Sequence, residues 1–244
     1  MYGFTSNPVM TIIFLVLILE NIGSYLSNPS ALLGLVLSLP GLLIAVTFHE
    51  YAHAFVADKL GDDTPRRQGR LTLNPLAHID PYGAILMLTA GFGWGKPVEI
   101  SPYNFNRTIS IKKGNALVSV AGPAMNFILA VIFSLIYGIA LKLFGTFFYT
   151  DAGIIIGDVL TTTIAMNVGL GVFNLIPLYP LDGYKILLYF LPTNARNWCV
   201  KNQNVFYIVF IIIWLTPISS LLISPAINAI DNWLIKLIIT IANL

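Results

Sequence analysis

Long stretches without a single charged residue recur along this chain, and they restrict its fold more than any other feature. Each of five such stretches contains about 18 residues or more, enough apolar length to cross a bilayer as an α-helix. Only 10% of the 244 residues are charged, against about 25% in an ordinary soluble domain. The sequence therefore predicts an all-α polytopic membrane protein with about five to six transmembrane helices. The stretches are 2–19, 31–48, 114–141, 159–181 and 202–230.

The basic residues are concentrated in three of the polar segments between those stretches. Of the 13 Lys and Arg residues, four lie in 59–70, four in 96–113 and three in 185–201. Loops rich in Lys and Arg stay in the cytoplasm, so we expect all three segments on that side, with the N-terminus inside. The predicted spans are about 4–26, 31–58, 114–142 and 152–179, with a fifth running outward from about 204.

Two segments fit this plan less directly. The apolar part of 81–95 is about 13 residues long, short for a span, and favours a re-entrant loop or β-hairpin element that enters and leaves on one side. The last stretch, 225–244, is interrupted by Asp231 and Lys236. It is consistent with a sixth span or with an amphipathic helix lying in the interface. With no appended soluble domain visible, we expect residues 1–244 to form a single membrane-embedded domain.

The second apolar stretch ends in the sequence HEYAH. On a helix, His49 and His53 are four residues apart, so both imidazoles project from one face and can share a tetrahedral metal ion. Glu50 lies beside the first ligand, where it can contact water rather than the metal. A chance match is the alternative, at roughly one chain in a hundred of this length from ordinary residue usage. Ionisable groups near the end of a hydrophobic helix are costly unless paired or coordinated, which favours the metal site.

A catalytic zinc needs a third protein ligand, and the sequence NLIPLYPLDGYK at the end of the fourth stretch offers one. Asp182 is the only carboxylate between Asp158 and Asp231. With the orientation above, the helix ends that carry Asp182 and His49 lie on the same side of the membrane. An ordinary Asp-Gly turn at a helix end is the alternative. We expect His49, His53 and Asp182 to hold one zinc ion per chain.

Together these motifs resemble the site-2 protease family of intramembrane zinc metalloproteases. The resemblance covers about residues 40–190 and implies a three-span catalytic core, here about 31–190, flanked by helices at 4–26 and 204–243. It implies that the two histidines and Asp182 bind zinc and that Glu50 is the general base. Some members carry PDZ or CBS domains, for which these 244 residues leave no room. The matching residues are His49, Glu50 and His53 in H-E-x-x-H, Asn174, Pro177, Asp182 and Gly183 in N-x-x-P-x-x-x-x-D-G, and the shorter stretches NPLAHIDPYG, GWGKPVEI and AGPAMNF.

Three further polar residues are candidates for supporting roles. Asn174 can hydrogen-bond the substrate backbone or a developing oxyanion, or equally a neighbouring helix. His78 is a candidate for substrate or oxyanion binding, although a solvated loop histidine is the interpretation that its position favours. Asn126 follows Gly122 and Pro123, and we expect it to serve close helix packing. The stretch GFGWGKPVEI suits an exposed edge to which an unwound substrate adds as a strand.

These residues favour an intramembrane zinc metalloendopeptidase that cuts membrane-embedded proteins near the cytoplasmic face. The expected partners are a substrate with a transmembrane segment and the lipid bilayer. The net charge of +2 is too small to suggest nucleic-acid binding. The expected location is a bacterial or archaeal cell membrane, with the active site toward the cytoplasm; the sequence does not indicate the oligomeric state.

Two other classes of function compete with the protease. A non-catalytic membrane scaffold or metal-binding protein that retains the protease fold is the main alternative, but a structural metal site needs no base such as Glu50. A metal transporter would need further His, Asp or Glu residues along its other spans. The first, third and fifth predicted spans offer none beyond Glu20 near an end, so the transporter ranks last.

Overall fold

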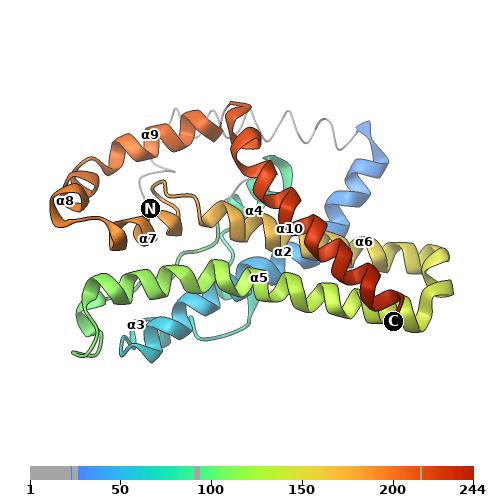
Figure 1. Ribbon diagram of the computed structural model, residues 1–244, viewed down its shortest axis with the longest axis horizontal. Coiled ribbons are helices and arrows are strands. Elements are labelled where there is room, and N and C mark those ends of the chain that lie inside the picture. Colours follow the sequence, from blue (N-terminus) through green and yellow to red (C-terminus); the bar gives the residue numbers. More distant parts are fainter. Residues whose placement is uncertain (1–22, 24–26, 91–93, 215) are drawn as a thin grey trace.

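The computed structural model is a bundle of long helices joined by short helical turns (Figure 1). It describes residues 23, 27–90, 94–214 and 216–244. No β-strand is assigned within these ranges, so the predicted all-α class is confirmed there. Short helical turns in the connections are α3 (Thr64–Arg67), η1 (Pro75–Ala77), η2 (Pro102–Asn104) and η3 (Gly145–Tyr149). The longer helices are α2 (Pro29–Lys59), α4 (Pro81–Ala90), α5 (Ile111–Phe144), α6 (Asp151–Asn174), α7 (Asp182–Phe190), α8 (Thr193–Lys201), α9 (Gln203–Trp214) and α10 (Ile218–Ala242).

Local sequence signals start the three helices at the centre of the bundle. Asn28 caps α2 through its side-chain oxygen, and Pro29 follows in the first turn. Ser110 caps α5 and Thr150 caps α6, each by accepting a hydrogen bond from a backbone N–H in the first turn. Because such side chains satisfy N–H groups that lack an intrahelical partner, these helix starts are encoded locally.

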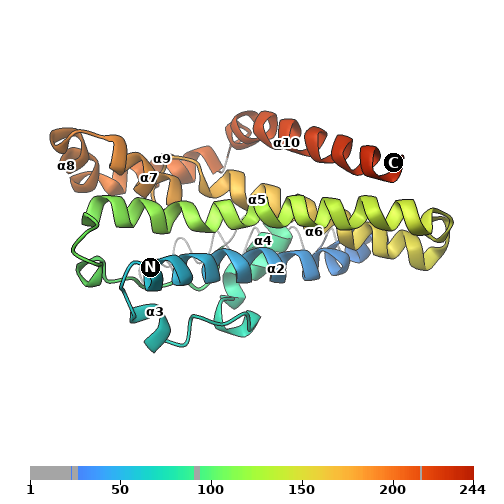
Figure 2. The same cartoon turned by 60° about the horizontal axis from the view of Figure 1, so that its bottom comes forward.

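Helices α2, α5 and α6 lie side by side, and α10 packs along α5 and α6 (Figures 1 and 2). Small residues permit the close approach: a Cβ atom on Gly41 of α2 would lie 2.8 Å from the Cα atom of Thr163 on α6. Contact through small residues is the usual packing mode of helices in membranes. One apolar core cluster joins α5, α6 and α10 and contains Ala130, Ile164, Val168, Leu234 and Ile238.

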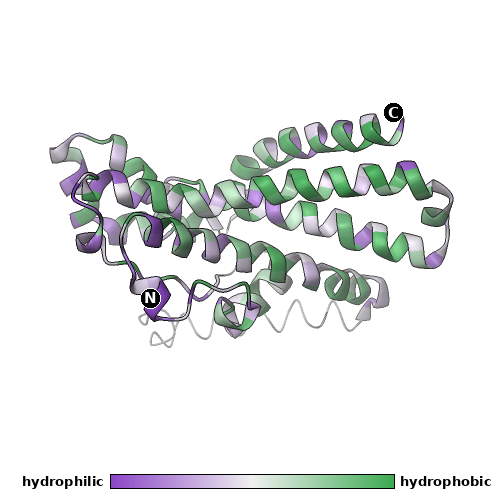
Figure 3. Cartoon of the chain, turned by 90° about the horizontal axis from the view of Figure 1, so that it is seen from below, coloured by the Kyte–Doolittle hydropathy of each residue, from purple (hydrophilic) through white to green (hydrophobic). Residues whose placement is uncertain are grey.

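Four helices in the described ranges are long and apolar enough to span a membrane: α2, α5 with η3, α6 and α10. The first three coincide with the spans predicted at 31–58, 114–142 and 152–179. The predicted span at 4–26 lies outside the described residues except for Gly23. Large apolar side chains are exposed along all four helices, and Figure 3 shows hydrophobic residues over most of their length. A multi-pass membrane protein accounts for this surface.

The chain after α6 differs from the prediction. The helix ends at Asn174 rather than at 179, and 175–181 form turns before α7 begins at Asp182. The predicted fifth span is divided into the 12-residue α9, too short to cross a bilayer, and α10. The stretch 225–243 is therefore no separate sixth element, because it continues the helix that starts at Ile218.

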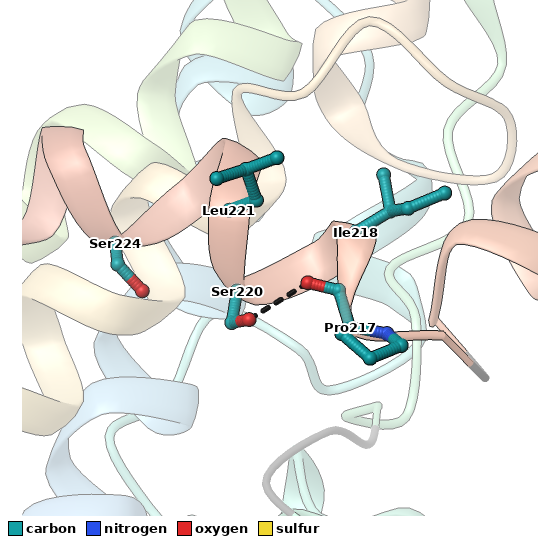
Figure 4. A pocket seen from close by; sticks show the side chains of 5 residues that line it. All are labelled: Pro217, Ile218, Ser220, Leu221 and Ser224. Carbon is teal, nitrogen blue, oxygen red and sulfur yellow. Dashed lines mark hydrogen bonds between the residues drawn. The ribbon is translucent and has the colours of Figure 1, made fainter.

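A shallow hollow lies where α10 begins (Figure 4). The Ser220 hydroxyl in its wall donates to the carbonyl of Pro217, at 2.8 Å. No titratable side chain lines the hollow, so it contributes nothing to metal or acid–base chemistry. Its lining residues are Pro217, Ile218, Ser220, Leu221 and Ser224.

The segment predicted to be re-entrant contains a helix. Residues 81–90 form α4, not a strand of a hairpin, and 91–93 lie outside the described residues. Strand character is limited to an antiparallel bridge between Ile79 and Gly95, beside which the Lys96 N–H donates to the His78 carbonyl at 2.7 Å. The bridge brings Ile79 and Gly95 together, and the re-entrant placement of the segment in the membrane stays a prediction.

The three basic segments meet at one end of the bundle, where α3, α8 and the start of α5 lie (Figure 2). The Asn106 N–H donates to the Leu60 carbonyl at 2.7 Å, which joins the end of α2 to the segment before α5. Lys112 Nζ donates to the Leu191 carbonyl at 3.1 Å, which joins α5 to the α7–α8 connection. Hydrophilic residues are concentrated at this end (Figure 3).

Candidate metal centre

The two histidines of the HEYAH sequence lie on the buried face of α2. His49 and His53 are 4% and 8% exposed, and their Nε2 atoms are 3.0 Å apart. Their i and i+4 spacing places both rings on one side of the helix, as predicted.

Asp182 is brought to these rings by α7, of which it is the first residue. Its Oδ2 atom lies 3.3 Å from His49 Nε2 and 3.0 Å from His53 Nε2. Its other oxygen, Oδ1, lies 3.5 Å from Lys185 Nζ. The next residue, Gly183, allows this approach because a Cβ atom there would lie 2.3 Å from the carbonyl oxygens of both Leu175 and Ile176. Steric contact therefore explains why a glycine follows Asp182.

The three side chains fit a tetrahedral metal ion. Zinc–nitrogen and zinc–oxygen bonds of about 2.0–2.1 Å in tetrahedral geometry place ligand atoms about 3.3–3.4 Å apart, and the three separations here are 3.0, 3.0 and 3.3 Å. Within the part of the chain that the structure describes, His49, His53 and Asp182 are the group of ligand side chains able to hold a metal ion. All three are buried, and one tetrahedral position is left for a reactant.

The far side of each imidazole is held by a hydrogen-bond acceptor on α5. His53 Nδ1 lies 2.7 Å from the Val118 carbonyl oxygen, and His49 Nδ1 lies 2.6 Å from Asn126 Oδ1. Metal-binding histidines usually donate their second N–H to such a partner, which fixes the ring and its tautomer. Asn126, expected only to aid helix packing, is therefore a direct partner of the site. The AGPAMNF stretch was the sequence signal that could have identified Asn126 as a partner of the site. A backbone carbonyl such as that of Val118 leaves no signal in the sequence.

Gly122 of the same helix faces both rings. A Cβ atom at this position would lie 2.4 Å from His53 Nε2 and 2.7 Å from His49 Cε1. Only a glycine leaves space for the histidines where α5 passes them. Gly122 belongs to the stretch for which close helix packing was expected, and its packing partner is the pair of imidazoles.

Glu50 is half-buried beside the segment 95–100. Its Oε2 atom accepts a hydrogen bond from the Val98 N–H at 3.1 Å. A Cβ atom on Gly95 would lie 3.2 Å from Glu50 Oε1 and 2.9 Å from a methyl group of Val46. One carboxylate oxygen is thus held by the backbone, and the glycine keeps space beside the other.

His78 and Asn174 are placed differently from the three ligands. His78 is fully buried, so its interpretation as a solvated loop histidine is wrong. Its Nε2 donates to the Thr72 carbonyl at 2.7 Å, and burial lowers its pKa, which keeps the ring neutral. Asn174 is the last residue of α6, and its Nδ2 donates to the Leu170 carbonyl of its own helix at 3.0 Å. This is not the bond to a neighbouring helix that the sequence suggested as an alternative, and the Asn174 side chain remains partly exposed.

Comparison with known proteins places this geometry in a family. The model of peptidase family M50 matches residues 142–216, a range that includes Asn174 and Asp182. The chain is 39% identical over 200 residues to the Bacillus subtilis protein named "Putative zinc metalloprotease YwhC", covering 80% of this chain and 88% of the relative. It is 31% identical over 207 residues to the Mycolicibacterium smegmatis protein named "Putative zinc metalloprotease Rip2", covering 83% and 71%.

An archaeal protein is also similar: zinc metalloprotease MJ0392 of Methanocaldococcus jannaschii is 30% identical over 176 residues, which are 72% of this chain and 39% of that protein. No solved structure matches the chain. The match to the Bacillus subtilis relative extends over most of both chains. This chain therefore belongs to peptidase family M50, the site-2 protease family, and is a zinc metalloprotease of the membrane.

Proposed function

We propose that this metalloprotease hydrolyses peptide bonds of membrane-embedded substrate proteins near the cytoplasmic face of the cell membrane, with one zinc held by His49, His53 and Asp182. The observation that carries the proposal is the convergence of the three ligand atoms, 3.0–3.3 Å apart, between helices able to span a membrane. The single domain 1–244, with its catalytic core at about 31–190, is part of the same proposal.

The depth of the cluster supports a substrate within the membrane. His49 lies ten residues before the end of α2, about 15 Å along the helix axis. Val118, which contacts His53, lies seven residues after the start of α5, about 10 Å along it. With a hydrocarbon core of about 30 Å, these depths support a site within the spanning part of the bundle. The basic residues at the nearer end support a cytoplasmic orientation.

The chemistry follows from the placement of the protein's own groups. Zinc at this site supplies Lewis acidity toward the scissile carbonyl and lowers the pKa of water at its open position. Glu50 takes a proton from the attacking water and then delivers it to the leaving amine, first as base and then as acid. The Val98 N–H holds Glu50 Oε2 during both transfers, so Oε1 is the oxygen that moves the proton.

The segment 95–100 is proposed to hold the substrate in an extended form. A transmembrane helix must unwind before its amides can be cut, and strand addition to an exposed edge keeps a peptide extended. The segment is anchored by the Lys96 N–H on the His78 carbonyl and, just beyond it, by the Ser101 N–H on Asp62 Oδ2 at 2.6 Å. Asn174 is proposed to bind the substrate backbone or the oxyanion. His78 supports this edge through its main-chain carbonyl rather than through its ring.

The test is cleavage of a model single-span substrate by the purified protein in detergent, with the zinc content measured on the same samples. Glu50→Gln should retain about one zinc per chain and lose about 10²- to 10⁴-fold in rate, the usual contribution of a general base. Wild type treated with phenanthroline should lose both zinc and cleavage. Zinc retention without cleavage of several different substrates by wild type would instead support the non-catalytic scaffold.

A further inference from the structure

A chain of buried amides runs from His49 across the bundle to α6. Asn126 on α5 donates from Nδ2 to the Ala45 carbonyl of α2 and to Asn167 Oδ1 on α6, at 3.0 Å each. Asn167 Nδ2 in turn donates to the Thr163 carbonyl at 2.9 Å. Both asparagine side chains are fully buried. A buried amide is costly unless it is hydrogen-bonded, and an apolar side chain of similar size would pack here without that requirement.

The orientation of each amide follows from groups that can only accept. The Thr163 carbonyl can only accept, so Asn167 Nδ2 faces it and Asn167 Oδ1 faces Asn126. The Ala45 carbonyl likewise can only accept, so Asn126 Nδ2 faces it and Asn126 Oδ1 faces His49 Nδ1. An acceptor at 2.6 Å requires that His49 Nδ1 carry the proton. The lone pair of the neutral ring is then on Nε2, the atom that faces His53 and Asp182.

We propose that Asn167 is a positioning residue for the metal site, which acts through Asn126 to hold His49 in the tautomer that offers Nε2 to zinc. The proposal rests on the metal site proposed above and assigns a role to a residue outside the H-E-x-x-H and N-x-x-P-x-x-x-x-D-G motifs. If Asn126 turned over, its NH₂ group would face His49 Nδ1 and move the proton to Nε2, where it would block the metal. Asn167 opposes this rotation together with the Ala45 carbonyl, because each of these two oxygens would then face another oxygen.

The first test measures zinc transfer from the loaded protein to a chelator in excess. Asn126→Leu should weaken zinc retention about 10- to 100-fold, the range for partners of metal ligands. Asn167→Leu, one step further away, should reach about tenfold, the low end of that range. Ser134→Ala is the matched control, since this fully buried hydroxyl of α5 bonds only the Ala130 carbonyl of its own helix. It should leave zinc retention unchanged.

A double-mutant cycle separates positioning from general stability. If Asn167 acts only through Asn126, Asn167→Leu should have no further effect on zinc retention when Asn126→Leu is already present. An undiminished effect of Asn167→Leu in that background would overturn the proposal. So would unchanged zinc retention in Asn167→Leu with a lowered melting temperature, the result expected of a purely structural residue.

The second test uses the wild-type protein, so its result does not require that any variant fold correctly. The chain contains three histidines, so ¹⁵N-histidine labelling produces three pairs of ring nitrogen signals. In the zinc-loaded protein His49 and His53 should carry the proton on Nδ1, and His78 should carry it on Nε2, which donates to the Thr72 carbonyl. Zinc bound through Nδ1 of His49 would overturn the proposal.

Failure of the proposed protease function can be distinguished from failure of the proposed role of Asn167. Both tests here score zinc retention and ring protonation rather than cleavage. A wild-type protein that holds zinc but cuts no substrate therefore contradicts the proposed function. The role of Asn167 is then decided by the double-mutant cycle. Cleavage by the wild-type protein, together with zinc loss from Asn167→Leu that is no faster than from wild type, contradicts only the proposed role of Asn167.

Discussion

His53 Nδ1 lies 2.7 Å from the backbone carbonyl oxygen of Val118, a residue 65 positions away in the chain. A carbonyl can only accept, so this contact directs the proton to Nδ1 and the lone pair of the neutral ring to Nε2. Asn126 performs the same task for His49 from the same helix. Helix α5 thus orients both histidines of α2.

Gly122→Ala should reduce zinc binding to well below one ion per chain. The added methyl carbon would lie 2.4 Å from His53 Nε2, so the ring must leave its position. Displacement of a catalytic group by about 1 Å can cost 10²-fold in rate, and we expect at least that loss of cleavage together with substoichiometric zinc. Gly169→Ala on α6 is the control, because nothing lies within 4 Å of a Cβ atom there. Full zinc content in Gly122→Ala would contradict the close approach of α5 to the rings.

Metal removal should be reversible. The rings are held from their Nδ1 sides by α5, through atoms that do not face the metal position. Protein stripped with a chelator and dialysed should keep its helical circular dichroism and regain cleavage when zinc is added. Cobalt should also restore activity, since imidazole and carboxylate ligands accept it. Loss of helical signal on stripping would show that the metal, rather than the helix contacts, organises the site.

Asp62→Asn should destabilise the protein at neutral pH by about 2 kcal/mol, as expected for hydrogen bonds to a charged group. Burial alone would raise the pKa of Asp62, but hydrogen bonds from Thr64, Ser101 and Asn104 outweigh it and hold the pKa below its usual range. A carboxyl group with a lowered folded-state pKa stabilises the fold above its unfolded pKa of about 3.9. That contribution is lost as the pH falls through the folded value.

The gap in melting temperature between wild type and Asp62→Asn should therefore be constant from about pH 8 to pH 5 and close below about pH 4. Asp63→Asn is the control: its side chain is 56% exposed and pairs with the exposed Arg67. A surface pair of this kind contributes at most about 1 kcal/mol. A difference in melting temperature that widens in acid would show that the folded-state pKa of Asp62 is raised rather than lowered.

Arg70→Lys should weaken substrate binding more than it slows chemistry. Arg70 is 4% exposed, and its guanidinium donates to the carbonyls of both Ala77 and Lys96, on the two sides of α4. A lysine ammonium lacks the fork that bridges two acceptors, so the segment 95–100 should lose its position. We expect KM to rise roughly tenfold, about 1.4 kcal/mol of binding, with zinc content unchanged. Arg67→Lys, whose side chain is 64% exposed, should have no effect. A variant that lost zinc while keeping its KM would place Arg70 in the metal site instead.

The sequence by itself determined the parts that depend on local properties. Charge-free length predicted α2, α5 and α6 to within a few residues, except at the end of α6, because a helix that crosses a bilayer needs only consecutive apolar residues. The four-residue spacing of His49 and His53 placed both on one helix face. Asp182 was identified because carboxylates are rare in such stretches. The separation of α9 from α10 was missed because the prediction relied on charge-free length, although Thr216, Pro217 and Ser219 mark the break in the sequence.

Only the tertiary structure decided how these parts work together. Asn126 and Val118 contact His49 and His53, and Asn167 contacts Asn126, because α5 and α6 pack against α2. No local pattern records which carbonyl or amide will face a ring. Burial of His78 likewise depends on how the segment 70–100 closes on itself. Hydrogen bonds join atoms that are close in space, whereas sequence patterns report residues that are close along the chain. The clustering of His49, His53 and Asp182 could therefore be predicted, and the groups that orient the two rings could not.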